Sequence, residues 1–309
     1  MKPTPDLLIP LQPRARLFVD NDHAGDPDGL WALAHLLLCP TVRTVAIGSA
    51  LLDPRLAAAA GVPTQRTAAL GQAAVVALLQ QLGSPGRTAW PPVLAGAEAP
   101  GPAHDADNAA AAALVDEALR DDALPLWVAC GGPLTNVAAA LRLAPRIADR
   151  ITLVWIGGTR QRPDADAVDE ATEYNFATDA QAAREVLACA GLRIHQVPRE
   201  AYRTLRVSVA ELGTALRPLS PLADWLHGRY RALPPFVRLG GSVTFGDSAL
   251  VLLCALTDAL TDTPGAATDD GVRRTGPLRW QHTMLDGRLL LADLQARLRL
   301  QAAGLSDAG

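Results

Sequence analysis

Four aspartates lie close together near the start of the chain, in the run Asp20-Asn21-Asp22-His23-Ala24-Gly25-Asp26-Pro27-Asp28. Carboxylates this close repel one another, so they either raise one another's pKa or bind a cation. Carboxylate oxygens are hard ligands, which favour Ca²⁺ or Mg²⁺ over zinc. A single aspartate could simply cap a turn or a helix. The group of four predicts a site for a hard divalent cation.

The elements around this acidic run follow a regular alternation. An apolar strand pattern at residues 17–19 precedes the run, and a helical pattern at residues 30–37 follows it. Further strands are predicted at residues 42–47, 91–94, 125–129, 151–156 and 193–197. Helices are predicted between them at residues 68–82, 108–119, 136–143 and 180–190. The alternation predicts an α/β fold with an open, mostly parallel sheet flanked by helices, and ligands bind such sheets at the carboxyl ends of the strands.

The last third of the chain is predicted to be mainly helical. Helical patterns lie at residues 209–216, 221–232 and 248–260, before a hairpin-like segment at residues 278–291. No linker long enough to divide the chain occurs, so residues 1–309 are expected to form a single domain. Residues 301–309 are expected to fray.

The composition limits the class of partner. A net charge of −4 with 49% hydrophobic residues indicates a globular protein and argues against a nucleic acid or an anionic membrane as the partner. No window reaches the roughly 20 consecutive apolar residues of a spanning helix, and residues 1–16 lack the apolar core of a secretory signal. We therefore expect a cytoplasmic protein that acts on a small molecule.

Two enzyme families begin with an aspartate pair at the end of a first strand. One is the haloacid-dehalogenase-like phosphatases, in which Asp20 would attack phosphorus and Asp22 would act as acid and base. Their usual Thr or Val after the pair is Ala24 here, and the further aspartate expected a few residues after Asp247 is missing. Because two parts of the motif are missing, a Mg²⁺-dependent phosphatase is kept only as the alternative hypothesis.

The chain resembles the second family, the nucleoside hydrolases, over residues 20–256. The signature of that family is an Asp-x-Asp pair followed shortly by aspartates that open a helix. Three later segments agree with it in order and spacing: Gly132-Pro133-Leu134-Thr135-Asn136, Glu173-Tyr174-Asn175-Phe176 with Asp179, and Asp247 at the start of a helix. The resemblance implies the α/β fold of that family and metal-dependent hydrolysis of the N-glycosidic bond of a ribonucleoside.

The resemblance also implies a role for each residue of the site. The catalytic base would be Asp22, which would also bind the metal. The other ligands of a Ca²⁺ ion would be Asp28, Asp247 and the main-chain carbonyl of Gly131. The residues that bind the sugar would be Asp26, Glu173 and Asn175. Asp20 would support the ligands from behind.

The chain departs from the family's pattern at three places. Pro27 separates two aspartates that are usually adjacent, so whether Asp26 or Asp28 binds the metal stays open. Gly246 stands where the family often has a histidine that assists the leaving base, and Ser49 stands where it often has an asparagine. Base specificity and the leaving-group acid therefore stay open. A third hypothesis is a metal-stabilised protein that binds ribose or nucleosides without turnover.

Two histidines are expected on loops at the carboxyl edge of the sheet, His23 and His104, and either could supply the missing acid. The partner implied by the resemblance is a nucleoside or related N-riboside, in purine or pyrimidine salvage. A homodimer or homotetramer is expected, because the family commonly forms these assemblies.

Overall fold

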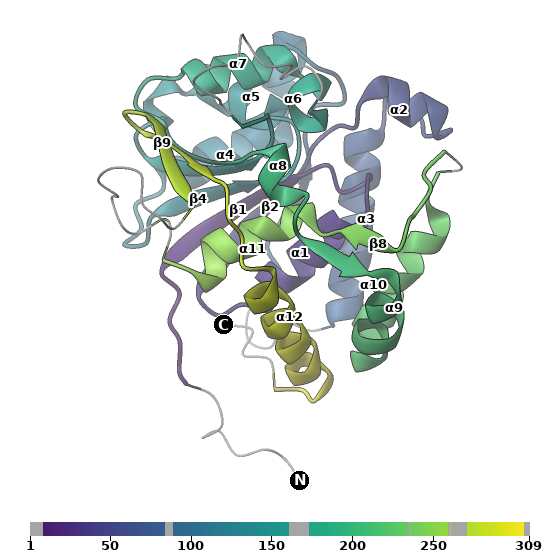
Figure 1. Ribbon diagram of the computed structural model, residues 1–309. Helices are drawn as coiled ribbons and strands as arrows, with labels where there is room; N and C mark the ends of the chain where they lie inside the picture. The colour runs from purple at the N-terminus through teal and green to yellow at the C-terminus, as the bar shows by residue number, and fades with distance from the viewer. Residues whose placement is uncertain are drawn as a thin grey trace.

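The computed structural model describes residues 9–83, 89–160, 173–234, 236–258, 260 and 271–305. Eight of the described strands form one sheet in the order β3-β2-β1-β4-β5-β6-β10-β9 (Figure 1). Their bounds are β1 Ala15–Asn21, β2 Val42–Ser49, β3 Val93–Ala95, β4 Leu126–Cys130, β5 Ile151–Ile156, β6 Arg193–Val197, β9 Val272–Gly276 and β10 Arg279–His282. All neighbours are parallel except β9 and β10. The predicted α/β fold with a mostly parallel sheet is confirmed.

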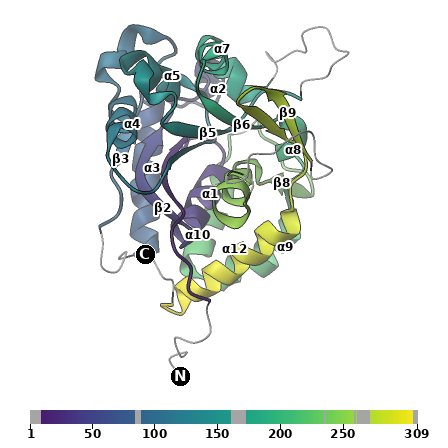
Figure 2. The ribbon, with the colours of Figure 1, turned by 90° about the vertical axis from the view of Figure 1, so that its left-hand side faces the viewer.

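Helices cover both faces of this sheet (Figure 2). One face packs against α1 Asp28–Leu37, α3 Thr67–Leu82 and α11 Ala249–Val251. The same core extends to α10 Pro221–Arg229, which packs on α3, and to α12 Gly287–Ala302, which packs on α10. The other face packs against α4 Ala109–Leu119, α5 Thr135–Leu143 and α7 Ala180–Ala188. In β1, Leu17 and Val19 join the first core and Phe18 joins the second. A strand buried on both faces needs apolar residues at successive positions, which is why β1 reads as a continuous apolar run.

Short elements connect these layers. The α-helical ones are α2 Pro54–Ala59, α6 Tyr174–Thr178, α8 Arg199–Tyr202 and α9 Val209–Glu211. Short 3-10 or π turns are η2 Pro102–Asp107, η3 Pro145–Ile147, η5 Leu212–Leu216, η6 Arg217–Leu219, η7 Tyr230–Ala232, η8 Gly246–Ser248 and η9 Leu252–Leu256. No helix in the described part of the chain is long and apolar enough to cross a membrane.

The last third of the chain differs from its sequence prediction. A two-stranded antiparallel sheet of β7 Arg206–Ser208 and β8 Ser242–Thr244 was not predicted. The predicted hairpin-like segment at residues 278–291 is wrong in position, because the hairpin is β9–β10 and α12 begins at Gly287. Asp286 starts that helix by accepting a 2.9 Å hydrogen bond from the main-chain N of Leu289. The helix runs through Ala302, two residues into the segment expected to fray, and residues 306–309 lie outside the described residues.

Candidate metal centre and active site

The predicted site residues come from loops at one edge of the sheet. Strands β1, β2, β4 and β5 run parallel, so their carboxyl ends meet at the same edge. Asp20 lies in β1, Asp22 directly follows it, and Gly131 directly follows β4. Glu173 and Asn175 lie at the start of α6, after β5, while Asp247 lies in the turn η8.

The side chain of Asn21 joins the acidic loop to this distant turn. Its Nδ2 donates a 2.9 Å hydrogen bond to Oδ2 of Asp247, and its Oδ1 accepts a 2.8 Å hydrogen bond from the main-chain N of Asp22. The main-chain N of Asp247 donates in turn to Oδ2 of Asp28 at 3.2 Å. A Cβ atom at residue 29 would lie 3.1 Å from Oδ2 of Asp247, so glycine gives this contact its room. These bonds bring Asp247 and Asp28 to the acidic loop, although the ligand atoms of Asp22, Asp28 and Asp247 do not all lie within 4.8 Å of one another. Sequence reasoning missed Asn21 as the residue that joins them.

The charges of these carboxylates are poorly balanced by the described protein groups. Burial raises the pKa of Asp22 well above its ordinary value, and the charges of Asp26 and Asp28 raise it further. Burial and then the neighbouring Asp247 raise the pKa of Asp28, and burial followed by the charge of Asp22 raises that of Asp247. Asp26 itself is exposed. Half-buried carboxylates that repel one another make a donor set suited to a hard divalent cation such as Ca²⁺.

Asp20 has a supporting place behind the loop. The side chain is fully buried in β1, and its Oδ1 accepts a 2.9 Å hydrogen bond from Nδ2 of Asn136. Oδ1 of Asn136 accepts in turn from Nδ2 of Asn108 at 2.9 Å and from the main-chain N of Ala97 at 3.1 Å. Burial raises the pKa of Asp20 to about 7. A carboxylate enclosed in this way is poorly placed to attack a phosphate, which argues against the phosphatase alternative.

Asn175 fixes the main-chain carbonyl that was predicted to bind the metal. Its Nδ2 donates to the carbonyl oxygens of Gly131 at 2.8 Å and of Ile156 at 2.7 Å, and so joins the ends of β4 and β5. Its Oδ1 is buried and has no hydrogen-bond partner among the described residues. A buried amide oxygen without a partner is costly, so this atom is ready to accept a hydrogen bond from a bound molecule. At Gly131 a Cβ atom would lie 2.6 Å from Nδ2 of Asn21, which explains the glycine there.

The carboxylate of Glu173 is fixed by four hydrogen bonds within the protein. It is fully buried, and its Oε2 accepts hydrogen bonds from the main-chain N of Gly158 at 2.7 Å and of Phe176 at 2.9 Å. Its Oε1 accepts from the main-chain N of Asn175 at 3.2 Å and from the hydroxyl of Tyr202 at 2.9 Å. Burial raises the pKa of Glu173, while these donors oppose the rise. In this arrangement the carboxylate begins α6 and orients Asn175.

The three tyrosines of the chain all face this set of acidic groups. The hydroxyl of Tyr174 accepts a 3.2 Å hydrogen bond from the main-chain N of Asp53 and also hydrogen-bonds Asp22. The hydroxyl of Tyr230 is buried without a hydrogen-bond partner among the described residues, and burial followed by the charges of Asp28, Asp26 and Asp247 raises its pKa. No motif marked these roles, although Tyr174 lies inside the Glu-x-Asn segment.

Neither candidate histidine is placed to act as a charged acid. His23 is buried, and both of its ring nitrogens lack a hydrogen-bond partner among the described residues. Burial lowers the pKa of His23 to about 3, so the ring is neutral at neutral pH. His104 is exposed in η2.

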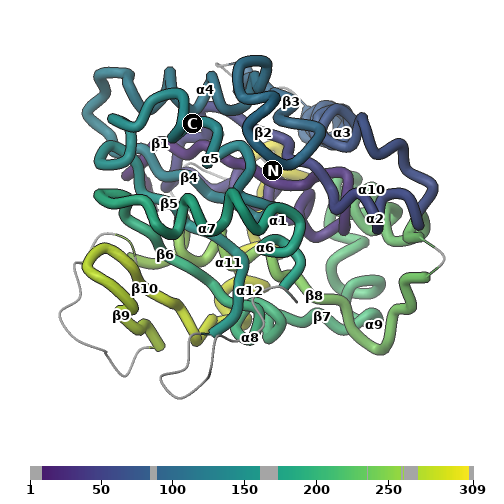
Figure 3. Tube along the Cα trace, turned by 90° about the horizontal axis from the view of Figure 1, so that it is seen from above, coloured from purple at the N-terminus to yellow at the C-terminus, as the bar shows by residue number. Residues whose placement is uncertain are grey.

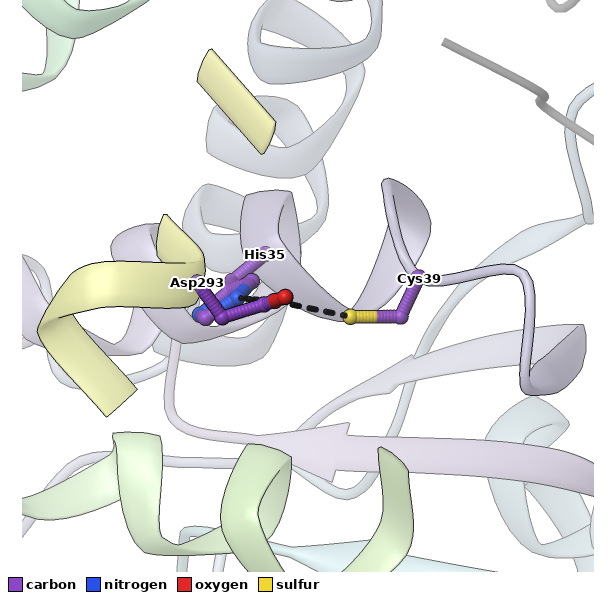
Figure 4. Close-up of side chains that lie close together, drawn as sticks. All are labelled: His35, Cys39 and Asp293. Atoms are coloured by element: carbon purple, nitrogen blue, oxygen red, sulfur yellow. Dashed lines mark hydrogen bonds and ion pairs between the residues drawn. The ribbon is translucent and has the colours of Figure 1, made fainter. Parts of the chain in front are cut away.

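A second group of potential ligands lies elsewhere, between α1 and α12 (Figure 4). Ligand atoms of His35, Cys39 and Asp293 lie within 4.8 Å of one another, and these form the one such set among the described residues. Nε2 of His35 lies 2.8 Å from Oδ2 of Asp293, which is a hydrogen-bond distance. Arg297 already balances Asp293 at 3.4 Å, and burial raises the pKa of the Cys39 thiol to about 12. The group therefore fits a clamp between two helices better than a metal site.

A parallel α/β sheet with carboxylates at its carboxyl edge is typical of an enzyme that acts on a small molecule. The chain belongs to the inosine-uridine preferring nucleoside hydrolase family, whose model matches residues 19–259. It is an N-glycosyl hydrolase, and the resemblance noted in the sequence is confirmed. Comparison with proteins of curated function gave no match.

Several solved structures share the fold. An inosine-guanosine nucleoside hydrolase has a TM-score of 0.66 and 18% identity, over 92% of this chain and 98% of that chain. A purine-preferring ribonucleoside hydrolase from Gardnerella vaginalis has a TM-score of 0.60 and 19% identity, over 93% of this chain and 99% of that chain. The type III effector protein XopQ, complexed with adenosine diphosphate ribose, has a TM-score of 0.63 and 16% identity, over 94% of this chain and 95% of that chain.

Proposed function

We propose that residues 1–309 act as one domain that uses Ca²⁺ to hydrolyse a ribonucleoside or related N-riboside to ribose and free base. The metal ligands are Asp22, Asp28, Asp247 and the carbonyl oxygen of Gly131. The observation that supports this assignment best is the hydrogen-bonded path Asp22–Asn21–Asp247–Asp28, which holds mutually repelling carboxylates at one edge of the sheet. Calcium, when bound there, would supply positive charge that acidifies a water and orients sugar hydroxyls.

The residues of the chain divide the chemical work between them. The oxygen of a water bonds to C1′ of the ribose while the C1′–N bond breaks, and the electron pair of that bond passes to the base nitrogen. Asp22 accepts the proton of the water, and the hydrogen bond from Tyr174 holds the Asp22 carboxylate in place. The departing base nitrogen takes up one proton from solvent and Asp22 releases the proton of the water to solvent, so one water is consumed and no net proton is gained or lost.

The sugar is held by groups on two sides of the proposed site. Asp26 is exposed at the edge of the loop and can accept a hydrogen bond from a sugar hydroxyl. The unpartnered Oδ1 of Asn175 can accept another. Glu173 acts on the sugar through Asn175, because its own oxygens already accept four hydrogen bonds. Asp20 stays behind the ligands and fixes Asn136.

The test is release of free ribose from a panel of purine and pyrimidine nucleosides by the purified chain. Release that stops after chelation and returns with Ca²⁺ supports the proposal. The panel includes 2′-deoxynucleosides, which lose one sugar hydroxyl and are expected to be poor substrates. Equal rates with and without the 2′-hydroxyl contradict the proposed sugar binding. Tight binding of ribose without release from any nucleoside would instead support a binding protein that has lost turnover. This outcome is measured because Gly246 stands where the family often has the histidine that assists the leaving base.

Assembly and location are part of the same proposal. A homodimer or homotetramer is proposed, which light scattering coupled to gel filtration tests directly. A cytoplasmic enzyme of purine or pyrimidine salvage remains our expectation, and fractionation of the producing cells tests the location.

A further inference from the structure

The ring of Tyr202 occupies the space beside Gly246. A Cβ atom at residue 246 would lie 3.0 Å from Cδ2 of Tyr202, which is tighter than ordinary van der Waals contact. Even the Cβ atom of alanine at 246 would need the ring to shift by a few tenths of an ångström, and a larger side chain would need more. The two positions therefore compete for one volume next to Asp247.

The small sheet missed by sequence reasoning creates this contact. Strand β7 begins four residues after Tyr202, and β8 ends two residues before Gly246. The strands are antiparallel, with Arg206 opposite Thr244, so these two ends lie together. The main-chain N of Phe245 also donates a 2.7 Å hydrogen bond to the carbonyl of Leu205. In Figure 3 the pair β7–β8 lies beside α8, which ends at Tyr202.

The hydroxyl of Tyr202 connects this wall to the residues proposed to hold the sugar. It donates a 2.9 Å hydrogen bond to Oε1 of Glu173. Oε1 of Glu173 also accepts from the main-chain N of Asn175, whose side chain fixes the Gly131 carbonyl. Since this hydroxyl proton is already used by Glu173, it is not free to protonate a departing base.

We propose that Tyr202 is a positioning and specificity-determining residue that fills the place of a side chain at 246 and holds Glu173. This inference rests on the proposed function and deepens it. Its consequence is a site with no proton donor on the wall formed by residues 202 and 246. A wall of this kind gives no proton to a leaving group that departs beside it, so it favours ribosides whose leaving group departs without one; the unpartnered hydroxyl of Tyr230 lies outside this wall. A p-nitrophenyl riboside, which leaves as a phenolate, is a probe of this class.

Four proteins test the shared volume: the wild type, Tyr202→Ala, Gly246→His and the double variant. Gly246→His alone is expected to lose most activity, because the imidazole meets the ring. The double variant is expected to recover at least about tenfold over Gly246→His, a coupling within the range seen for residues in contact. Losses that simply multiply would overturn the shared-volume argument. Gly240→His is the matched control, since a Cβ atom at exposed Gly240 meets nothing within 4 Å.

The specificity claim has its own readout. A histidine placed at 246 in the double variant can donate a proton, so the ratio of turnover of inosine to that of the p-nitrophenyl riboside should rise at least about tenfold over wild type. An unchanged ratio overturns the claim. Tyr202→Phe keeps the ring and loses only the hydrogen bond to Glu173, so it should lower kcat more than it raises KM. A Tyr202→Phe variant with wild-type constants would overturn the role of the hydroxyl.

Failure of the proposed function is distinguishable from failure of this inference. If the wild type releases ribose from neither nucleosides nor the p-nitrophenyl riboside, the proposed function fails. The competition between residues 202 and 246 is then still tested by the melting temperatures of the four proteins. A double variant that melts well above Gly246→His supports the shared volume, and additive shifts overturn it.

Discussion

Nδ2 of Asn21 donates a 2.9 Å hydrogen bond to Oδ2 of Asp247, although 226 residues separate them in the chain. Asn21 is the last residue of β1, and Asp247 lies in the turn η8 that leads into α11. The bond holds a carboxylate from the far end of the chain against the acidic loop. It uses one oxygen of Asp247 and leaves its charge unneutralised.

Replacing Asp247 by asparagine is expected to abolish most activity while leaving the fold intact. The change removes one charge of the proposed metal shell and keeps the shape of the side chain. We expect at least about a 100-fold loss of kcat/KM and a weaker affinity for Ca²⁺, as for loss of an ion ligand or its close partner. Calorimetric titration with Ca²⁺ and the ribose-release assay measure the two effects.

Asp149→Asn is the matched control for this change. Asp149 is exposed and lies two residues before β5, at the opposite edge of the sheet from the site. The control should keep wild-type affinity and activity. Wild-type Ca²⁺ affinity in Asp247→Asn would rule this residue out as a ligand.

Without bound metal, in the presence of a chelator, the protein is expected to lose stability as the pH rises from about 6.5 to about 8. Burial raises the pKa of Asp20 to about 7, and burial and neighbouring charges raise that of Asp247 to about 8. The folded state therefore binds more protons than the unfolded chain in this range, and stability falls as they leave. Buried His23, whose pKa is lowered to about 3, acts in the opposite direction, but only up to the ordinary histidine value of 6.5.

Thermal melts across this pH range, with a chelator or with excess Ca²⁺, measure the effect. Excess Ca²⁺ should raise the melting temperature and flatten the fall, because binding to the folded state alone stabilises it. A melting temperature that rises with pH in the chelator would contradict this assignment of the carboxylates. So would identical curves with and without Ca²⁺.

Asn175→Asp is expected to destabilise the protein more than Asn175→Ala. The aspartate would place an oxygen against the carbonyl oxygens of Gly131 and Ile156, which now accept hydrogen bonds from Nδ2. Alanine only leaves those two carbonyls without their donor, at a cost of about 1–3 kcal/mol for each buried group left unsatisfied. Urea denaturation of both variants measures the free energy of unfolding. Equal stability of Asn175→Asp and wild type would show that this amide does not clamp the two strand ends.

The clamp between His35 and Asp293 is expected to contribute stability without a metal. Asp293→Leu should cost about 1–3 kcal/mol, because it leaves the fully buried His35 without its partner. The double change to leucine at both positions should cost less than the single change, since no polar group is then orphaned. Denaturation of the two variants tests this order. A large rise of the wild-type melting temperature with Zn²⁺ that is lost in Asp293→Leu would instead indicate a metal site.

The parallel sheet was predictable because its strands are buried on both faces. Mainly apolar runs such as Ile151–Ile156 then mark the central strands, and the intervening helical periodicity indicates the α/β class. The pair β7–β8 escaped prediction because strands of three residues carry too little periodicity to be recognised. The start of α12 at Gly287 was not predicted, because only four residues separate it from the end of the hairpin β9–β10 at His282, and the two elements were read as one segment.

The site divides in the same way. The sequence by itself determined the chemistry, because four aspartates in one short run and the Glu-x-Asn segment are local patterns that can be read without a fold. Only the tertiary structure decided which groups meet: Asn21 with Asp247, Asn175 with Gly131, and the ring of Tyr202 with the space at Gly246. These contacts join residues far apart in the chain, and their partners are set by strand order and by a short antiparallel pairing. Spacing along the sequence does not show such contacts, so the residues that line the site could be identified only from the tertiary structure.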